Sequence, residues 1–330
     1  MNGSIRDAFG HSLVEVGRQF DNIVVVSCDL KGATKTRAFF EAFPERSFEV
    51  GIAEANGIGI AAGLALSGYR PFISSFASFI TGKNVEIRTS VAYNQAPVIV
   101  VGTHGGLIGP DGTTQAGLQD ITTMRAMPNF TILQPASPRE TAAMVRYLAC
   151  SFKPAYLRIA RNTVPEIYPI KYEFVPGKGR QLRTGKDLTL ISSGPPIHAC
   201  LCAADLLADT LDIGVVNLPT LKPVDRDIII DNAVKSSGII TVEDHSIEGG
   251  LGSIVCEVLA ESGTPAPVRR HGIYDEFTES GPPAELERKY RLDAAGICEV
   301  IEQFQSQQTA FRHRHFALSH LKDIYAIGRD

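Results

Sequence analysis

Short runs of β-branched residues alternate with segments of helical period along the whole chain. In the first half, strands are predicted at residues 22–28, 70–75, 96–102, 130–135 and 155–160. Helical periodicity lies between them, near residues 4–19, 53–67, 77–93 and 138–149. This alternation is typical of a mostly parallel sheet covered on both faces. The pattern therefore predicts a doubly wound α/β domain over residues 1–165.

A second series of the same kind follows in the other half of the chain. Its strands are predicted at 188–194, 212–218, 238–244 and 266–273. We expect a smaller α/β domain over residues 187–305. The segment 166–186 is rich in proline, glycine and charge without sustained periodicity, and we interpret it as a linker. The polar tail 306–330 is expected to be either a partner-contacting extension or a disordered end.

Composition changes this picture in a few respects. The 330 residues are 44% apolar, which is enough for two cores. The net charge of −4 and the absence of basic blocks argue against nucleic acid or a membrane surface as the main partner. Six scattered cysteines have no zinc-ligand spacing, so no metal site is expected. With neither a signal-peptide pattern nor about 18 consecutive apolar residues, the protein is expected in the cytoplasm.

One carboxylate stands in an otherwise apolar and glycine-rich stretch. Glu54 lies within EVGIAEANGIGIAAG, residues 49–63, where burial of a charge is costly. It is either an exposed acid at a helix start, favoured by the helix dipole, or a buried acid with a chemical role. The glycines of the stretch suggest that close packing is required there, because each costs about 1 kcal/mol in a helix. Spacing alone leaves both interpretations open.

Further candidates follow the predicted strands, where α/β sheets place their ligands. Asp29 follows the first strand and could cap the next element or contact a ligand. Phe76 and Phe79, in SSFASF, share a helix face and could pack in the core or stack on a flat cofactor.

Two later loops carry polar candidates as well. His104 and Asp111 lie in a long glycine-rich loop, THGGLIGPDGTTQ, and such loops are often functional, although a solvated turn is the alternative. Arg161 stands just past a strand end, where it suits a phosphate or carboxylate, or else a surface salt bridge.

Taken together and in this order, these motifs resemble the transketolase family. The resemblance covers residues 1 to about 305 and matches the pyrimidine-binding domain followed by the C-terminal domain. VGIAEAN is similar to the family segment with the catalytic glutamate, which implies that role for Glu54. SSFASF is similar to the segment whose aromatic rings hold the thiamine pyrimidine, which implies that role for Phe76 and Phe79.

The resemblance also implies a set of substrate contacts. His104 would contact a sugar phosphate, and Asp111 would contact a donor hydroxyl. Arg161, in RIARNTVP, is similar to a phosphate-binding arginine. Arg6, which stands 23 residues before Asp29 as in the family, is similar to the other one.

Family members bind the diphosphate and Mg²⁺ through a GDG motif in a separate domain, and no GDG occurs in this chain. The resemblance therefore implies the beta-type subunit of a split transketolase, whose alpha-type partner supplies the diphosphate and metal site. We expect an α2β2 heterotetramer with thiamine diphosphate between the chains. A buried Glu54 suits this cofactor, because burial favours the protonated carboxyl that a pyrimidine N1′ requires.

One departure from the family pattern concerns substrate choice. Gln115 stands where the family loop DGxTHQ has a histidine close to the reacting carbon. We therefore expect a sugar, or a modified sugar, outside the standard pentose phosphate set. Three alternatives remain: the beta subunit of a 2-oxoacid dehydrogenase E1, a deoxyxylulose phosphate synthase-like enzyme, and a non-catalytic scaffold subunit.

Overall fold

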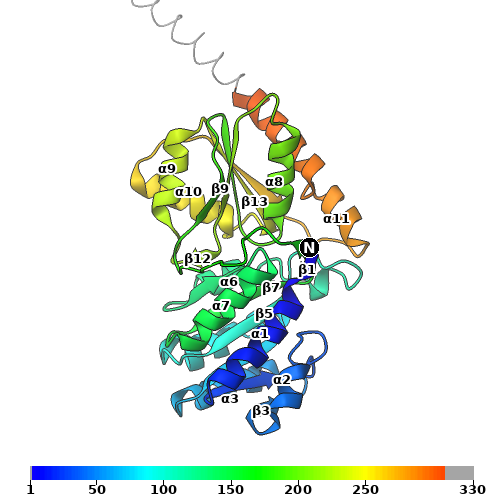
Figure 1. Ribbon diagram of the computed structural model, residues 1–330, viewed down its shortest axis with the longest axis vertical. Helices are drawn as coiled ribbons and strands as arrows, with labels where there is room; N and C mark the ends of the chain where they lie inside the picture. The colour runs from blue at the N-terminus through cyan, green and yellow to red at the C-terminus, as the bar shows by residue number, and fades with distance from the viewer. Residues whose placement is uncertain (1, 309–330) are drawn as a thin grey trace, which may run out of the picture.

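The computed structural model describes residues 2–308, which form two α/β units stacked along the long axis of the molecule (Figure 1). The predicted fold class is confirmed, because both large sheets are mostly parallel and carry helices. Almost all of the predicted tail, 306–330, lies outside the described residues. Its suggested role therefore stays a prediction.

The first unit is built on a seven-stranded sheet with the order β12-β6-β7-β5-β4-β2-β3. Every neighbouring pair is parallel except β12 with β6. The sheet comprises β2 (Ile23–Ser27), β3 (Ser47–Glu49), β4 (Arg70–Phe76), β5 (Ile99–Gly105), β6 (Thr131–Leu133), β7 (Ala155–Ala160) and β12 (Thr220–Lys222). The edge strand β12 comes from the second half of the chain, so the two halves share this sheet.

Helices cover both faces of this sheet. They are α1 (Ile5–Gln19), α2 (Arg37–Ala42), α3 (Glu54–Leu66), α4 (Ala77–Thr81), α5 (Asn84–Glu86), a π-helical segment (Ile87–Tyr93), α6 (Asp120–Arg125) and α7 (Pro138–Cys150). The helix predicted near 77–93 is interrupted, because α4 ends at Thr81 with Gly82 as its C-cap and the chain resumes as α5 and the π-helical segment. Glycine lowers helix stability, which explains the break.

Each face of the sheet has its own apolar core. All five residues of β2 are buried, as in a parallel sheet that is covered on both sides. Val25 belongs to the same buried cluster as Phe9 of α1 and Leu148 of α7, whereas its neighbour Val26 belongs to the cluster that contains Ile58 of α3. The alternation along β2 therefore fixes α1 and α7 on one face and α3 on the other.

The second unit has a five-stranded sheet with the order β14-β13-β10-β11-β9. It comprises β9 (Arg180–Arg183), β10 (Leu188–Ser192), β11 (Ile213–Asn217), β13 (Ile239–Ser246) and β14 (Val268–Ile273). Its helices are α8 (Pro196–Leu206), α9 (Arg226–Lys235), α10 (Leu251–Ser262), α11 (Pro283–Lys289) and a helix over 294–308. In Figure 1, α9 and α10 lie on one side of this sheet and α8 on the other.

The segment 166–186, which we interpret as a linker, contains strand β9. The strand pairs antiparallel with β11 at the sheet edge. Its four residues include a single apolar one, Leu182, and none of them is buried. An edge strand of this kind has no alternating pattern that a sequence could show. A further antiparallel pair, β1 (Asn2–Ser4) with β8 (Thr163–Pro165), lies outside the large sheets.

The two units share a continuous apolar core. Ile121 and Met124 of α6 belong to the same buried cluster as Leu251 and Val255 of α10. None of the helices within residues 2–308 combines the length and apolar character needed to cross a membrane.

Candidate active site

The candidate residues from the first half gather at one edge of the seven-stranded sheet. The parallel neighbours β2, β4, β5 and β7 all end at this edge. Asp29 follows β2, Phe76 ends β4, His104 lies at the end of β5, and Arg161 follows β7. Parallel strands therefore bring together residues that are up to 132 positions apart, as an open α/β sheet does at a ligand site.

Glu54 is the first residue of α3 and is buried, with 7% of its surface exposed. The Ser75 hydroxyl, on β4, donates a hydrogen bond of 2.8 Å to Glu54 Oε1. Among residues 2–308, no protein group is found that donates to Oε2. Of the two interpretations of Glu54, the structure therefore supports the buried acid, with one carboxyl oxygen held and the other available.

Aromatic rings gather at the ends of β4 and β5. The rings of Phe76 and Phe79 are stacked with centroids 5.3 Å apart, and both side chains are half-buried. The His104 imidazole lies against Phe76, with the two ring centroids 3.8 Å apart. These rings thus form a partly open aromatic wall rather than part of the closed core.

His104 is 3% exposed and adopts a left-handed backbone conformation, with φ of 60°. Its Nδ1 lies 3.0 Å from Thr103 Oγ1, and its Nε2 lies 3.5 Å from Arg6 Nη1. Arg6 Nη1 also donates to Ala33 O at 2.9 Å. Burial lowers the pKa of His104 to about 3, and the charges of Arg6 and Arg161 act in the same direction.

The two arginines both lie near His104. Burial lowers the pKa of Arg6, and the charge of Arg161 lowers it further. Arg161 Nη1 donates to Ile108 O at 2.7 Å and to Asp111 Oδ2 at 2.6 Å. The Asp111–Arg161 pair is about one-third exposed, so its carboxylate can exchange for another anion at modest cost.

Gln115 and Asp29 are less closely tied to this group. Gln115 ends the short turn Thr113–Gln115, where its carbonyl accepts from the Ser78 hydroxyl at 3.1 Å. Asp29 is exposed with φ of 61°, and its backbone N–H donates to Glu49 Oε1 at 2.7 Å. Within the described residues, no contact joins the Asp29 carboxylate to the other candidates. The structure brings its loop to the site edge and leaves its side chain free.

A buried ionic cluster contacts the glycine-rich loop and fixes its position. Arg158, on β7, is fully buried and donates to Asp120 Oδ2 at 2.9 Å and to Asp244 Oδ1 at 2.6 Å. The same guanidinium donates to Gly117 O at 2.8 Å. At Gly106, with φ of 85°, an added Cβ would lie 2.1 Å from Asp244 Oδ2. The end of β13 in the second unit thus supports the loop that carries Asp111.

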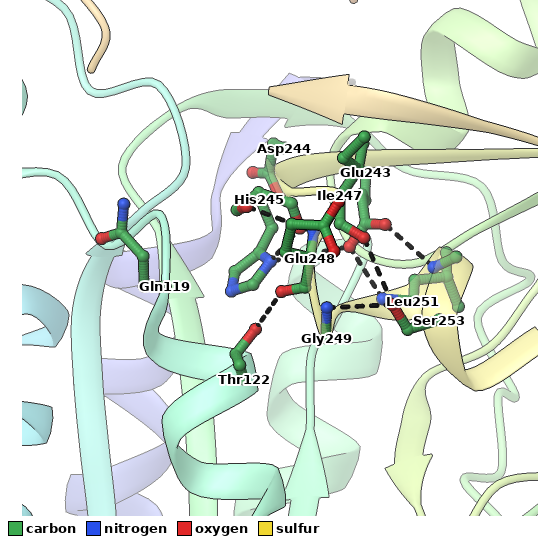
Figure 2. Close-up of polar contacts among 12 residues, drawn as sticks. Gln119, Thr122, Glu243, Asp244, His245, Ile247, Glu248, Gly249, Leu251 and Ser253 are labelled. Carbon is green, nitrogen blue, oxygen red and sulfur yellow. Dashed lines mark hydrogen bonds and ion pairs between the residues drawn. The ribbon is translucent and has the colours of Figure 1, made fainter. Parts of the chain in front are cut away.

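The residues around Asp244 are shown in Figure 2. Glu243 accepts from the N–H groups of Leu251 and Gly252, and so caps the N-terminus of α10. Burial raises the pKa of Glu243 to about 8 and lowers that of His245 to about 4. His245 Nε2 lies 3.9 Å from Asp120 Oδ1, so this carboxylate faces both Arg158 and the imidazole.

Sequence reasoning missed several of these residues. Arg158 offered a signal, because it is a lone charge in the apolar strand AYLRIA. Ser75 and Thr103 offered none, since a single small hydroxyl residue in a strand does not stand out from its neighbours. Asp120 and Asp244 each look like an ordinary helix-start or strand-end acid, and only the contact between the two units reveals their shared partner.

Comparison with known proteins places this chain in a family. Residues 2–166 match the transketolase pyrimidine-binding domain, and residues 177–297 match the transketolase C-terminal domain. The chain belongs to the transketolase family and corresponds to the C-terminal, beta-type subunit of a split transketolase.

Three similar proteins have this organisation. An apulose-4-phosphate transketolase subunit of Phocaeicola vulgatus is 37% identical over 303 residues, which are 91% of this chain and 96% of that protein. A 6-deoxy-6-sulfo-D-fructose transketolase subunit of Clostridium sp. is 34% identical over 296 residues, which are 89% of this chain and 92% of that protein. A solved structure described as a split gene transketolase, inactive beta4 tetramer, superposes with a TM-score of 0.85 at 39% identity, covering 92% of this chain and 99% of that one.

Proposed function

We propose that this chain supplies the pyrimidine side of a thiamine diphosphate site in an α2β2 split transketolase, which transfers a two-carbon ketol unit from a ketose to an aldose. The alpha-type partner would supply the diphosphate and Mg²⁺ site. The observation that carries the proposal is the buried Glu54, held at Oε1 by Ser75 beside the aromatic wall of Phe76 and Phe79.

The residues present fit the pyrimidine of thiamine diphosphate. Glu54 Oε2 is free to hold a proton toward a ring nitrogen, and the half-buried rings of Phe76 and Phe79 can receive a flat heterocycle. When bound, the cofactor supplies the nucleophile and the electron sink for the two-carbon fragment. The work of this chain is to position the ring, to hold the proton at Glu54 and to keep water out.

The opposite side of the site suits an anionic donor. Arg161 lies near enough to Arg6 for its charge to lower the pKa of Arg6, and it pairs with Asp111. Paired guanidinium groups bind phosphate or sulfonate oxygens through charge-assisted hydrogen bonds. The relatives named above act, by their names, on a sugar with a phosphate group and on one with a sulfonate group. With Gln115 in place of a histidine, we infer a modified or non-standard ketose as donor.

Reconstitution with an alpha-type chain that carries GDG tests the proposal. The purified pair is incubated with an aldose and a ketose donor (xylulose 5-phosphate, 6-deoxy-6-sulfofructose or an unphosphorylated ketose), and the products are measured by mass spectrometry. We expect an acceptor lengthened by two carbons, no carbon dioxide, and higher turnover with a donor other than xylulose 5-phosphate.

Three results would contradict the proposal. Carbon dioxide release from pyruvate without ketol transfer would favour a 2-oxoacid dehydrogenase subunit or a deoxyxylulose phosphate synthase-like enzyme. An inactive pair that still assembles would favour a scaffold. Clear preference for xylulose 5-phosphate would refute the non-standard donor alone.

A further inference from the structure

Thr103 lies near the end of β5 and contacts both Ser75, which holds Glu54, and His104, which lies near Arg6. Its side chain is fully buried, and its Oγ1 lies 3.3 Å from Ser75 O and 3.0 Å from His104 Nδ1. Ser75 in turn holds Glu54 through its own hydroxyl. The pairing of Phe76 on β4 with Thr103 on β5 creates this proximity.

The groups around Thr103 are compatible with one assignment of hydrogen-bond donors and acceptors, which runs from Arg6 through His104 and Thr103 to Ser75. A guanidinium can only donate, so the Arg6 N–H that faces His104 Nε2 requires a lone pair on that nitrogen. A neutral imidazole then carries its hydrogen on Nδ1, which donates to Thr103 Oγ1. The Thr103 hydroxyl is left to donate to the carbonyl of Ser75, which can only accept.

The opposite tautomer conflicts with these contacts. With its hydrogen on Nε2, His104 would direct an N–H against the Arg6 guanidinium. A doubly protonated His104 would add a cation beside Arg6 and Arg161, the charged groups that face it from α1 and from the end of β7. Burial already lowers the pKa of His104 to about 3, so the ring is neutral at physiological pH.

We propose that Thr103 is a positioning residue that holds His104 as the Nδ1–H tautomer, so that His104 Nε2 orients Arg6 toward the substrate. The anionic end of the donor is then bound by the guanidinium groups of Arg6 and Arg161. This inference rests on the proposed function for the identity of the ligand.

Nitrogen NMR of the full chain tests the tautomer without any activity. In ¹⁵N-histidine-labelled protein, the eight histidines are resolved and His104 is assigned by its loss in His104→Gln. We expect an Nδ1–H signature that stays unchanged from pH 8 to pH 5, because the lowered pKa of His104 keeps the ring neutral there. An Nε2–H or imidazolium signature at pH 7 overturns the proposal.

Kinetics of the assembled pair test the role of Thr103. In Thr103→Val, which removes the hydroxyl at nearly constant shape, we expect KM for an anionic donor to rise up to tenfold with kcat changed less than twofold. Thr103→Ser should restore the wild-type KM. Thr241→Val is the matched control, because Thr241 is equally buried and its Oγ1 has no hydrogen-bond partner within the described residues.

The outcomes separate this inference from the proposed function. Wild-type KM in Thr103→Val, or no rescue by Thr103→Ser, overturns the positioning role. If the assembled pair transfers no ketol unit, the proposed function fails, whereas the NMR signature of His104 still decides the tautomer.

Discussion

At the scale of single residues, the site depends on how buried polar groups are satisfied. Glu54 is tolerated in an apolar helix start because Ser75 donates to one of its oxygens. His104 is tolerated because Thr103 and Arg6 occupy its two nitrogens. Each chemical group therefore has a neighbour that fixes its orientation, as a preorganised site requires.

The Ser75 hydroxyl should matter for turnover more than for folding. Ser75→Ala leaves Glu54 without its hydrogen bond, and we expect kcat of the assembled enzyme to fall about tenfold while the free energy of unfolding falls by about 1 kcal/mol. Ser74→Ala is the control, since the adjacent Ser74 is also buried but its hydroxyl has no partner within residues 2–308. Stopped-assay kinetics and urea unfolding measure both. Equal kcat in the two variants would contradict the role given to Ser75.

The sequence reveals residues whose chemistry conflicts with their surroundings. Glu54 stands out because a carboxylate interrupts an apolar run, and Arg158 could have been found by the same reasoning. Ser75 and Thr103 could not, because their roles come from the register that places Phe76 opposite Thr103. Register depends on contacts across the sheet and is not visible in either strand alone.

At the scale of elements, the loop after β5 is shaped by close packing against the second unit. Its apolar residues Leu107, Ile108 and Leu118 are buried in the core cluster of that unit. Gly106 N–H donates to Gly117 O at 2.9 Å, which closes the base of the loop. The glycine-rich loop is therefore held by the second unit, so the C-terminal domain helps to fix the position of Asp111.

Substitution by alanine should change the free energy of unfolding in opposite directions at two glycines of the first unit. Gly106→Ala places a Cβ against Asp244 at a positive φ, and we expect the free energy of unfolding to fall by about 1–3 kcal/mol. Gly59 lies within α3, where an added Cβ meets nothing within 4 Å, so Gly59→Ala should raise it by about 1 kcal/mol. Urea unfolding of the isolated chain measures both. A stable Gly106→Ala variant would refute the close packing.

The elements predicted from the sequence are those with a strong apolar period. The strands β2, β4 and β7 are continuous buried runs, and their predicted bounds lie close to the observed ones. Strand β9 was missed because its residues are half-exposed at an edge, and β12 because it is three residues long and belongs to the sheet of the other unit. Both strands form through pairing with residues far away in the sequence.

At the scale of the whole molecule, a buried charge cluster joins the two units. Arg158 from the first unit pairs with Asp120 and with Asp244 from the second. The desolvation of such charges is costly, and the cost is offset only when every partner is present. The cluster therefore favours one arrangement of the units, the one that also holds the glycine-rich loop.

Removal of the Arg158 guanidinium should lower the free energy of unfolding far more than removal of an exposed guanidinium. Arg158→Met leaves two buried carboxylates unpaired, and we expect a loss of about 3–5 kcal/mol in the free energy of unfolding. Arg226→Met is the matched control, because its partner Glu261 and Arg226 itself are exposed and such pairs contribute about 0–1 kcal/mol. Thermal and urea unfolding compare the two. Similar losses in both variants would show that the cluster does not join the units.

The central claim is that Glu54 is the catalytic acid that this chain brings to a two-chain transketolase. The most direct measurement is ketol transfer by Glu54→Gln in complex with the alpha-type partner, beside the wild-type pair and the wild-type chain alone. We predict that the variant still assembles but loses turnover by about 10²-fold or more, and that the chain alone transfers nothing. Wild-type turnover by the assembled Glu54→Gln pair would contradict the account.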